Sequence, residues 1–145
     1  MTVPPETATE RTIHSLVILG ELASGLFEVL DSAIGDGTHS AGEVLEMCWP
    51  VFASRRNDPV LRDFFELIGL ASSRVEPYAT LAPTTLRAWA DWLTPRMSGP
   101  ADGRRARAVA VMSQVDGLLL MRQTIGRRAA DEAFAVLVRT WRDAV

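Results

Sequence analysis

One acidic side chain stands out among the residues that could do chemistry. Asp116 lies in an otherwise apolar stretch, Ala108 to Met121, whose only other plainly polar residues are Ser113 and Gln114. A buried, ionised carboxylate without a partner is costly, so we expect Asp116 to have one. Three roles are open for Asp116: it could cap a neighbouring helix, pair with an arginine in the fold or across a dimer, or anchor a ligand at the floor of a cavity. General acid–base catalysis is a weaker interpretation, because no second carboxylate or histidine has a readable relation to it.

The remaining candidates for catalysis or metal binding are isolated. His14 and His39 have no partner at His-x₃-His or Glu-x-x-His spacing, so the sequence predicts no metal site. Cys48 has no readable base beside it and is interpreted as a small buried hydrophobe. Glycine-rich phosphate loops and the Gly-x-Ser-x-Gly motif are absent from the sequence. We therefore expect no catalytic residues and no cofactor, and we predict that the chain is not an enzyme.

Aromatic and thioether side chains recur along the segments predicted to be helical. Ordinary core packing explains each of them singly, but together they are typical of a pocket between the helices of a bundle. Ser113 and Gln114 are candidates for its few polar groups. We expect an apolar ligand, flat or long, with one hydrogen-bonding group. The candidate ligand-binding residues are Met47, Phe52, Phe64, Phe65, Trp89, Trp92, Met112 and Asp116.

The elements that must position these residues are helices. Apolar residues recur at steps of three and four over 8–34, and Gly35 is expected to end that helix. A capping-box pattern, Ser40-x-x-Glu43, predicts the start of a second helix, which Pro50 should kink or split. Asp58-Pro59 predicts a third helix with Asp58 as its N-cap.

The second half of the chain has the same character. A fourth helix is predicted to start at Pro83-Thr84-Thr85 and to end near Thr94-Pro95, followed by a loop over 98–103. A fifth helix is predicted over about 104–125, and Gly126 separates it from a sixth. No segment alternates in the manner of a β-strand. The sequence therefore predicts an all-α bundle of about six helices, with residues 1–145 forming a single domain.

The fifth predicted helix also indicates self-association. It is apolar nearly all round, so it must be covered on more than one side. One cover is the core of the chain, and we expect the other to be a second copy. Gly117 would let two helices approach closely. The candidate dimer-interface residues are Val111, Gly117, Leu118, Phe134, Leu137, Val138 and Trp141.

Composition narrows the functional classes. The chain has 145 residues and a net charge of −3, and its basic residues are all arginine, which is typical of a GC-rich genome. A mildly acidic balance disfavours direct binding of nucleic acid by this chain. The longest apolar runs are far shorter than the ~20 residues of a membrane-spanning helix. We read no signal peptide at the N-terminus, and with a single cysteine no internal disulfide is possible, so we expect a cytoplasmic protein.

Two stretches resemble a known family. The sequences Ala-Val-Ala-Val-Met-Ser-Gln-Val-Asp-Gly-Leu-Leu-Leu (108–120) and Ala-Ala-Asp-Glu-Ala-Phe-Ala-Val-Leu (129–137) resemble the last two helices of tetracycline-repressor-like (TetR) regulators. The patterns around Asp58-Pro59 and Trp89-x-x-Trp92-Leu93 are similar to earlier parts of the same regulatory domain. The resemblance covers roughly residues 10–143, and its motifs are loose.

The resemblance implies a ligand-binding domain that forms a homodimer, with the last two helices of each copy making a four-helix bundle. It departs from the family in one respect, because too few residues precede the first long helix for a helix-turn-helix reader. We therefore expect either a regulatory domain without that reader or a fragment, and in both cases no direct DNA binding by this chain. A heterodimer with an intact regulator is one way in which such a chain could act. Two alternatives stay open: a helical interaction module with no ligand, and a small α-helical enzyme.

Overall fold

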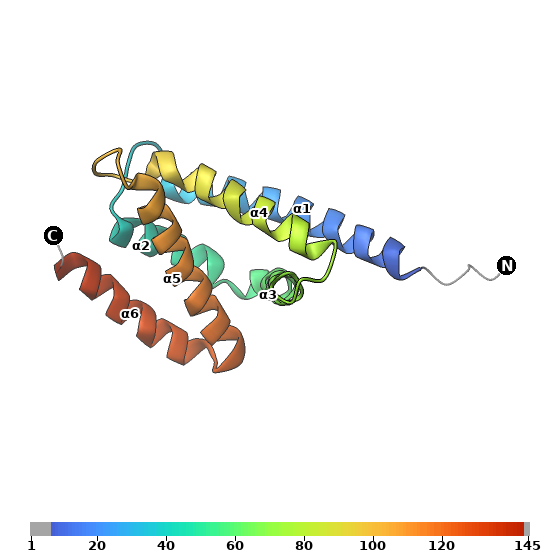
Figure 1. The fold of residues 1–145 in the computed structure, drawn as a ribbon. Helices are drawn as coiled ribbons and strands as arrows, with labels where there is room; N and C mark the ends of the chain where they lie inside the picture. The colour runs from blue at the N-terminus through green and yellow to red at the C-terminus, as the bar shows by residue number, and fades with distance from the viewer. Residues whose placement is uncertain (1–6, 144–145) are drawn as a thin grey trace.

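The computed structural model describes residues 7–143, except for the side chains at positions 8, 9, 11, 15, 18, 19, 22 and 23. This part of the chain is all-α, as predicted from the sequence, and none of its helices is long and apolar enough to cross a membrane. The helices are α1 (Ala8–Ile34), α2 (Ala41–Phe52), α3 (Asp58–Ser72), α4 (Tyr78–Leu93), α5 (Arg104–Thr124) and α6 (Arg127–Asp143), with short 3₁₀ turns η1 (Arg55–Asn57) and η2 (Thr94–Arg96) (Figure 1).

The ends of α1 and α2 follow the sequence signals. Gly35 ends α1 with a φ of +66°, a conformation that glycine adopts without strain. Ser40 caps α2: its hydroxyl accepts the Glu43 N–H at 3.3 Å, and the Glu43 carboxylate accepts the Ser40 N–H at 2.7 Å. Thr7 and Glu10 form a second capping box at the start of α1, which the sequence analysis did not single out.

Prolines mark the helix boundaries less well. Pro50, which was predicted to kink or split the second helix, does not split it: Pro50 lies inside α2, which continues to Phe52. The predicted start of α4 at Pro83 is wrong: the helix begins at Tyr78 and Pro83 lies inside it. Proline removes a backbone donor and costs stability there, but the longer helix packs against α3 and brings Tyr78, Leu81 and Ala82 to the lining of an apolar pocket.

Helix α5 forms the middle of the core. It packs against α2, α3, α4 and α6 (Figure 1), so the chain itself covers much of the apolar surface that was predicted to be covered on more than one side. One face of α5 is buried over its whole length. That face consists of Ala108, Val111, Val115, Leu118, Leu119 and Arg122.

A buried ion pair joins the C-terminal end of α5 to the rest of the bundle. The Arg122 side chain is only 4% exposed and donates to the Asp58 carboxylate and, at 2.6 Å, to the Ala53 carbonyl oxygen. Arg127 approaches the second oxygen of Asp58 at 3.5 Å. Asp58 was predicted to cap α3, but it is the first residue of that helix and binds these arginines instead; Asn57 occupies the N-cap position.

The other end of α5 is held by the loop before it. The Arg107 guanidinium donates to the Pro100 carbonyl oxygen at 2.6 Å and to the Ser98 carbonyl oxygen at 3.2 Å. The loop over 98–103 lies where the sequence predicted it. Arg107 therefore fixes the loop to the first turn of α5.

Candidate functional site

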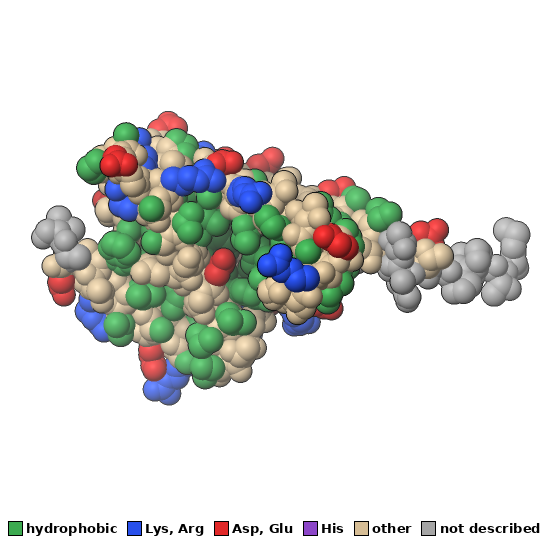
Figure 2. All heavy atoms as spheres, in the orientation of Figure 1, with side chains coloured by type: hydrophobic (Ala, Val, Ile, Leu, Met, Phe, Trp, Pro, Cys, Tyr) green, Lys and Arg blue, Asp and Glu red, His purple; other side chains and the backbone are tan. Residues whose placement is uncertain are grey.

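A cavity of about 280 Å³ lies between the first five helices. Its described lining comes from α1, α2, α3, α4 and α5, and none of it from α6. Figure 2 shows hydrophobic side chains gathered in a hollow on this face of the molecule. The volume is close to the lower end of the range for small-molecule sites, about 300–1,000 Å³.

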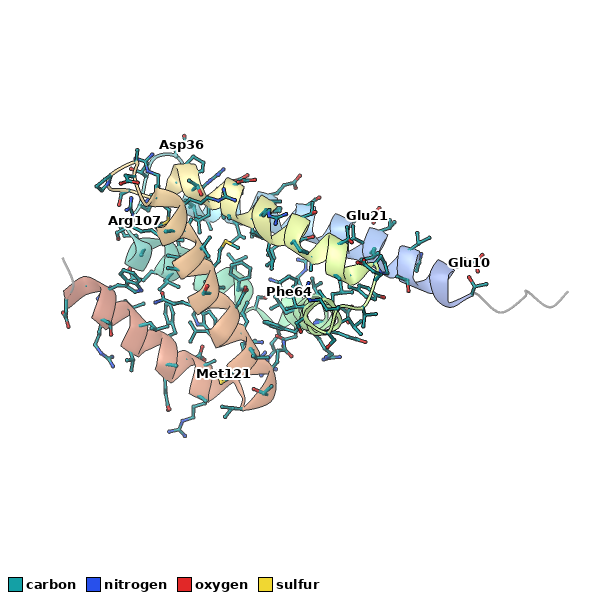
Figure 3. All side chains as sticks on the ribbon, viewed as in Figure 1. Glu10, Glu21, Asp36, Phe64, Arg107 and Met121 are labelled. Carbon is teal, nitrogen blue, oxygen red and sulfur yellow. The ribbon has the colours of Figure 1, made fainter. Side chains whose placement is uncertain are left out.

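Six of the eight predicted ligand-binding residues line the cavity. They are Phe52, Phe64, Trp89, Trp92, Met112 and Asp116. In Figure 3, Phe64 lies where α3 faces α4 and α5. Two predicted residues, Met47 and Phe65, are not part of the lining and instead pack against the buried core. Each is next in sequence to a lining residue, Cys48 or Phe64, and a helix turns by about 100° between neighbours, so adjacent side chains point in different directions.

Aromatic rings form one wall of the cavity. Trp89 stacks on Phe27 with ring centroids 3.8 Å apart, meets Trp92 edge to face at 5.8 Å, and lies 6.1 Å from Phe52. Phe27 was not among the predicted site residues, although it belongs to the apolar pattern of 8–34. It supports Trp89 from behind, because it packs on the indole without being part of the lining itself.

Asp116 is the only charged residue among the described residues of the lining. Its carboxylate forms no hydrogen bond or ion pair with any part of the chain that the structure describes. The sequence analysis expected a capping or arginine partner, and the described part of the fold does not supply one. Burial raises its pKa from the ordinary 3.8 to about 6, because the apolar surroundings disfavour the charged form. An unpaired carboxylate in an apolar cavity is therefore available to a ligand.

The other polar groups of the lining are engaged or uncharged. The Tyr78 hydroxyl donates to the Thr12 hydroxyl at 3.3 Å, and the Thr85 hydroxyl donates to the Leu81 carbonyl oxygen at 3.3 Å. Burial raises the pKa of the Cys48 thiol to about 12, which keeps it protonated and unreactive at neutral pH. The site thus offers one carboxylate in an apolar, aromatic pocket.

Ser113 and Gln114, the other polar candidates, lie outside this cavity. The exposed Ser113 hydroxyl donates to the Val109 carbonyl oxygen of its own helix at 2.8 Å. Gln114 points toward α6, where its side-chain oxygen accepts the Trp141 indole N–H at 2.8 Å. Neither residue contributes to the lining.

Most of the predicted interface residues lie within the protomer itself. Val111, Leu118 and Val138 are buried in the single chain and have little surface to offer a partner. Phe134 stacks on Trp49 with centroids 5.4 Å apart. The half-buried side chains of Phe134, Leu137 and Trp141 pack against the core.

Gly117 and its neighbours differ, because they lie on the opposite, exposed side of α5. A Cβ added at Gly117 would meet nothing within 4 Å, so packing inside the described chain does not require glycine there. Exposed residues at helical spacing continue this face, and none of them is charged. We name this surface the outer strip: Val109, Ala110, Ser113, Gly117, Leu120, Met121 and Thr124.

Comparisons with protein families, with curated proteins and with solved structures find no match to this chain. Within residues 7–143, no three histidine, cysteine, aspartate or glutamate side chains gather as metal ligands. The function must therefore be argued from the cavity and the outer strip.

Proposed function

We propose that this chain is the ligand-sensing and dimerising domain of a TetR-like transcriptional regulator, and that it binds a small, largely apolar molecule in the cavity. The observation that carries the proposal is the cavity itself. A bundle of this size has no structural need for a space lined by rings from α2, α3 and α4, since cores pack to crystal-like density. Such a lining with a single polar anchor is typical of ligand sites between helices.

A binding role fits the lining better than a catalytic one. General acid–base catalysis needs a second group to receive or return the proton. The described lining supplies only Asp116, because the Cys48 thiol stays protonated and Tyr78 is hydrogen-bonded to Thr12. We therefore propose that the protein is not an enzyme.

The outer strip supports the dimeric part of the proposal. An uncharged face along more than four turns of a helix is unusual at a water-exposed surface, and Leu120 and Met121 are 41% and 37% exposed there. We propose that a second copy of the chain covers it, with α6 completing a four-helix interface. The contact then lies on the outer strip rather than on Val111, Leu118 or Val138.

The proposed mechanism is a shift between two arrangements of the helices. A ligand that binds one arrangement better raises its population by the difference in affinity. Because α5 lines the cavity on one side and has the outer strip on the other, any change in its position reaches the dimer contact directly. We propose no direct DNA binding by this chain; the readout belongs to an attached or partner subunit, such as an intact regulator in a heterodimer, in the cytoplasm.

Native mass spectrometry of the freshly purified chain tests the ligand and the dimer together. The proposal expects twice the 15.9 kDa mass of the chain plus a reproducible small adduct. A dimer without an adduct, and without any uptake of added apolar probes, would contradict ligand sensing and favour a plain interaction module. A monomer at micromolar concentration would contradict the dimer.

A pair of glycine variants tests the dimer contact more sharply. Gly117→Arg places a large cation in the middle of the outer strip and should give monomers. Gly69→Arg is the matched control, because a Cβ at Gly69 on α3 also meets nothing within 4 Å. Both variants should keep or slightly raise the stability of the folded protomer, since glycine is a poor helix former. A Gly117→Arg protein that remains dimeric would show that the contact lies elsewhere.

A further inference from the structure

The cavity holds an uncompensated negative charge. Asp116 is the one charged residue among the described residues of its lining, and no described donor binds it. The residues one turn away on either side, Met112 and Leu120, offer it no hydrogen bond. A charged group kept in this setting lowers stability unless something outside the chain compensates it.

The arginines of the same helix do not provide that compensation. Arg105 and Arg122 pair with Asp91 and Asp58 respectively. Arg104 and Arg107 donate to carbonyl oxygens of the loop before α5. All four guanidinium groups are thus bound elsewhere.

The arginine that lies over the aromatic wall, Arg96, is neutralised as well. Arg96 lies over the Trp92 ring at 4.5 Å and forms an ion pair with Asp31 at 2.6 Å. Asp31 also accepts the Trp92 indole N–H at 2.8 Å, which fixes this indole in place. The charge of Arg96 is therefore balanced by α1, and it does not reach into the cavity to pair with Asp116.

The aromatic wall offers a second element of cation recognition. Trp89, Phe52 and Phe64 line the same partly open space as the carboxylate. The faces of such rings attract ammonium groups, and tryptophan does so most strongly. A carboxylate together with several ring faces is a combination suited to an organic cation with an apolar body.

We propose that the ligand is a lipophilic cation, an organic ammonium whose charged end binds the Asp116 carboxylate while its apolar body contacts the aromatic wall. This inference rests on the proposed ligand-binding function and specifies the ligand class. A neutral apolar molecule would leave the carboxylate unpaired in the filled cavity, and an anion would be repelled by it.

The protonation of Asp116 supports this assignment. With a pKa raised to about 6 by burial, the carboxyl is mostly ionised at neutral pH and mostly protonated at pH 5. The Cys48 thiol, whose pKa burial raises to about 12, carries no charge in this range. Affinity for a permanent cation should therefore fall by about tenfold from pH 7.5 to pH 5, because a cation selects the ionised form.

Three probes of equal chain length test the proposal by calorimetric titration of the full chain below their micelle-forming concentrations. They are decyltrimethylammonium, 1-decanol and decanoate. We expect decyltrimethylammonium to bind about tenfold more tightly than decanol at pH 7.5, and decanoate to bind most weakly. In Asp116→Asn the cation should lose this advantage and its pH dependence, while decanol binding is retained.

Asp63→Asn is the matched control. Asp63 is an exposed acid on α3, which lines the cavity with its other face, so this variant makes the same change in net charge outside the cavity. Its preference for the cation should equal that of the unmodified chain. Retained decanol binding in both variants shows that the folded cavity is present.

The outcomes separate the two proposals. If decanol binds as tightly as the cation, or if Asp116→Asn keeps the preference, the lipophilic-cation inference is overturned and the ligand-binding function stands. If Asp63→Asn loses the preference as well, the effect is one of net charge and the assignment to Asp116 is overturned. If none of the three probes binds, the proposed ligand-binding function fails, and the inference fails with it.

Discussion

Replacing Asp116 with asparagine should stabilise the ligand-free protein at neutral pH. The carboxyl has a pKa of about 6 in the folded chain against an ordinary 3.8, a rise of about two units. Each unit corresponds to about 1.4 kcal/mol, so the ionised group costs the fold up to about 3 kcal/mol above pH 6. The folded state binds the extra proton between these two values. Stability from this group is therefore present below about pH 4, is lost as the pH rises to 6, and stays lost above it.

The assay is urea unfolding followed by circular dichroism, at a fixed protein concentration, in steps from pH 4 to pH 8. At pH 7.5 Asp116→Asn should have a free energy of unfolding up to about 3 kcal/mol higher than the unmodified chain, and the two should converge near pH 4. Asp63→Asn should stay within about 0.5 kcal/mol of the unmodified chain throughout, as expected for an exposed site. A less stable Asp116→Asn protein at pH 7.5 would refute the reasoning, because it would mean that the carboxylate makes a favourable interaction in the fold.

Three further substitutions test the packing. Asp58→Ala should lower the unfolding free energy by about 3 kcal/mol in urea titrations, since it strands the buried Arg122 charge; a loss no larger than that of the exposed acid Asp91→Ala would contradict this. Ser40→Ala should cost about 1 kcal/mol through the lost cap, seen as a drop of a few degrees in the thermal midpoint, and an unchanged midpoint would argue against the capping box. Phe134→Glu should lower the thermal midpoint strongly, because the ring packs inside the protomer; an unchanged midpoint would place that side chain at the surface.

Local signals in the sequence predicted the helices well where one interaction decides the outcome. Ser40 and Glu43 lie three residues apart and satisfy each other's backbone, so the start of α2 needs no knowledge of the rest of the chain. Gly35 likewise ends α1 through its own conformational freedom. The helix start predicted at Pro83 was wrong because a proline inside a helix costs only about 3 kcal/mol, and burial of neighbouring side chains can outweigh that cost.

The candidate site was predicted less completely, because its membership depends on directions and distances that spacing does not supply. The apolar pattern includes both Phe64 and Phe65, but only the three-dimensional arrangement of α3 decides which ring reaches the cavity. The pairing of Arg122 with Asp58 joins positions 64 residues apart and has no local signature. The sequence also could not predict that Asp116 lacks a partner, because this depends on which groups the nearby arginines bind.

The two ends of α5 are fixed unequally, and this has a mechanical consequence. A buried arginine, Arg122, holds the C-terminal end, whereas the arginines at the N-terminal end make exposed contacts: Arg107 binds a surface loop and Arg105 binds Asp91 on α4. A tilt of α5 that kept the buried Arg122 contacts would pivot near that residue. At about 1.5 Å per residue the arm to Arg105 is about 26 Å, so a tilt of about 5° would displace its far end by about 2 Å. Asp116 lies close to the pivot and moves little, while Val109 on the outer strip moves about twice as far.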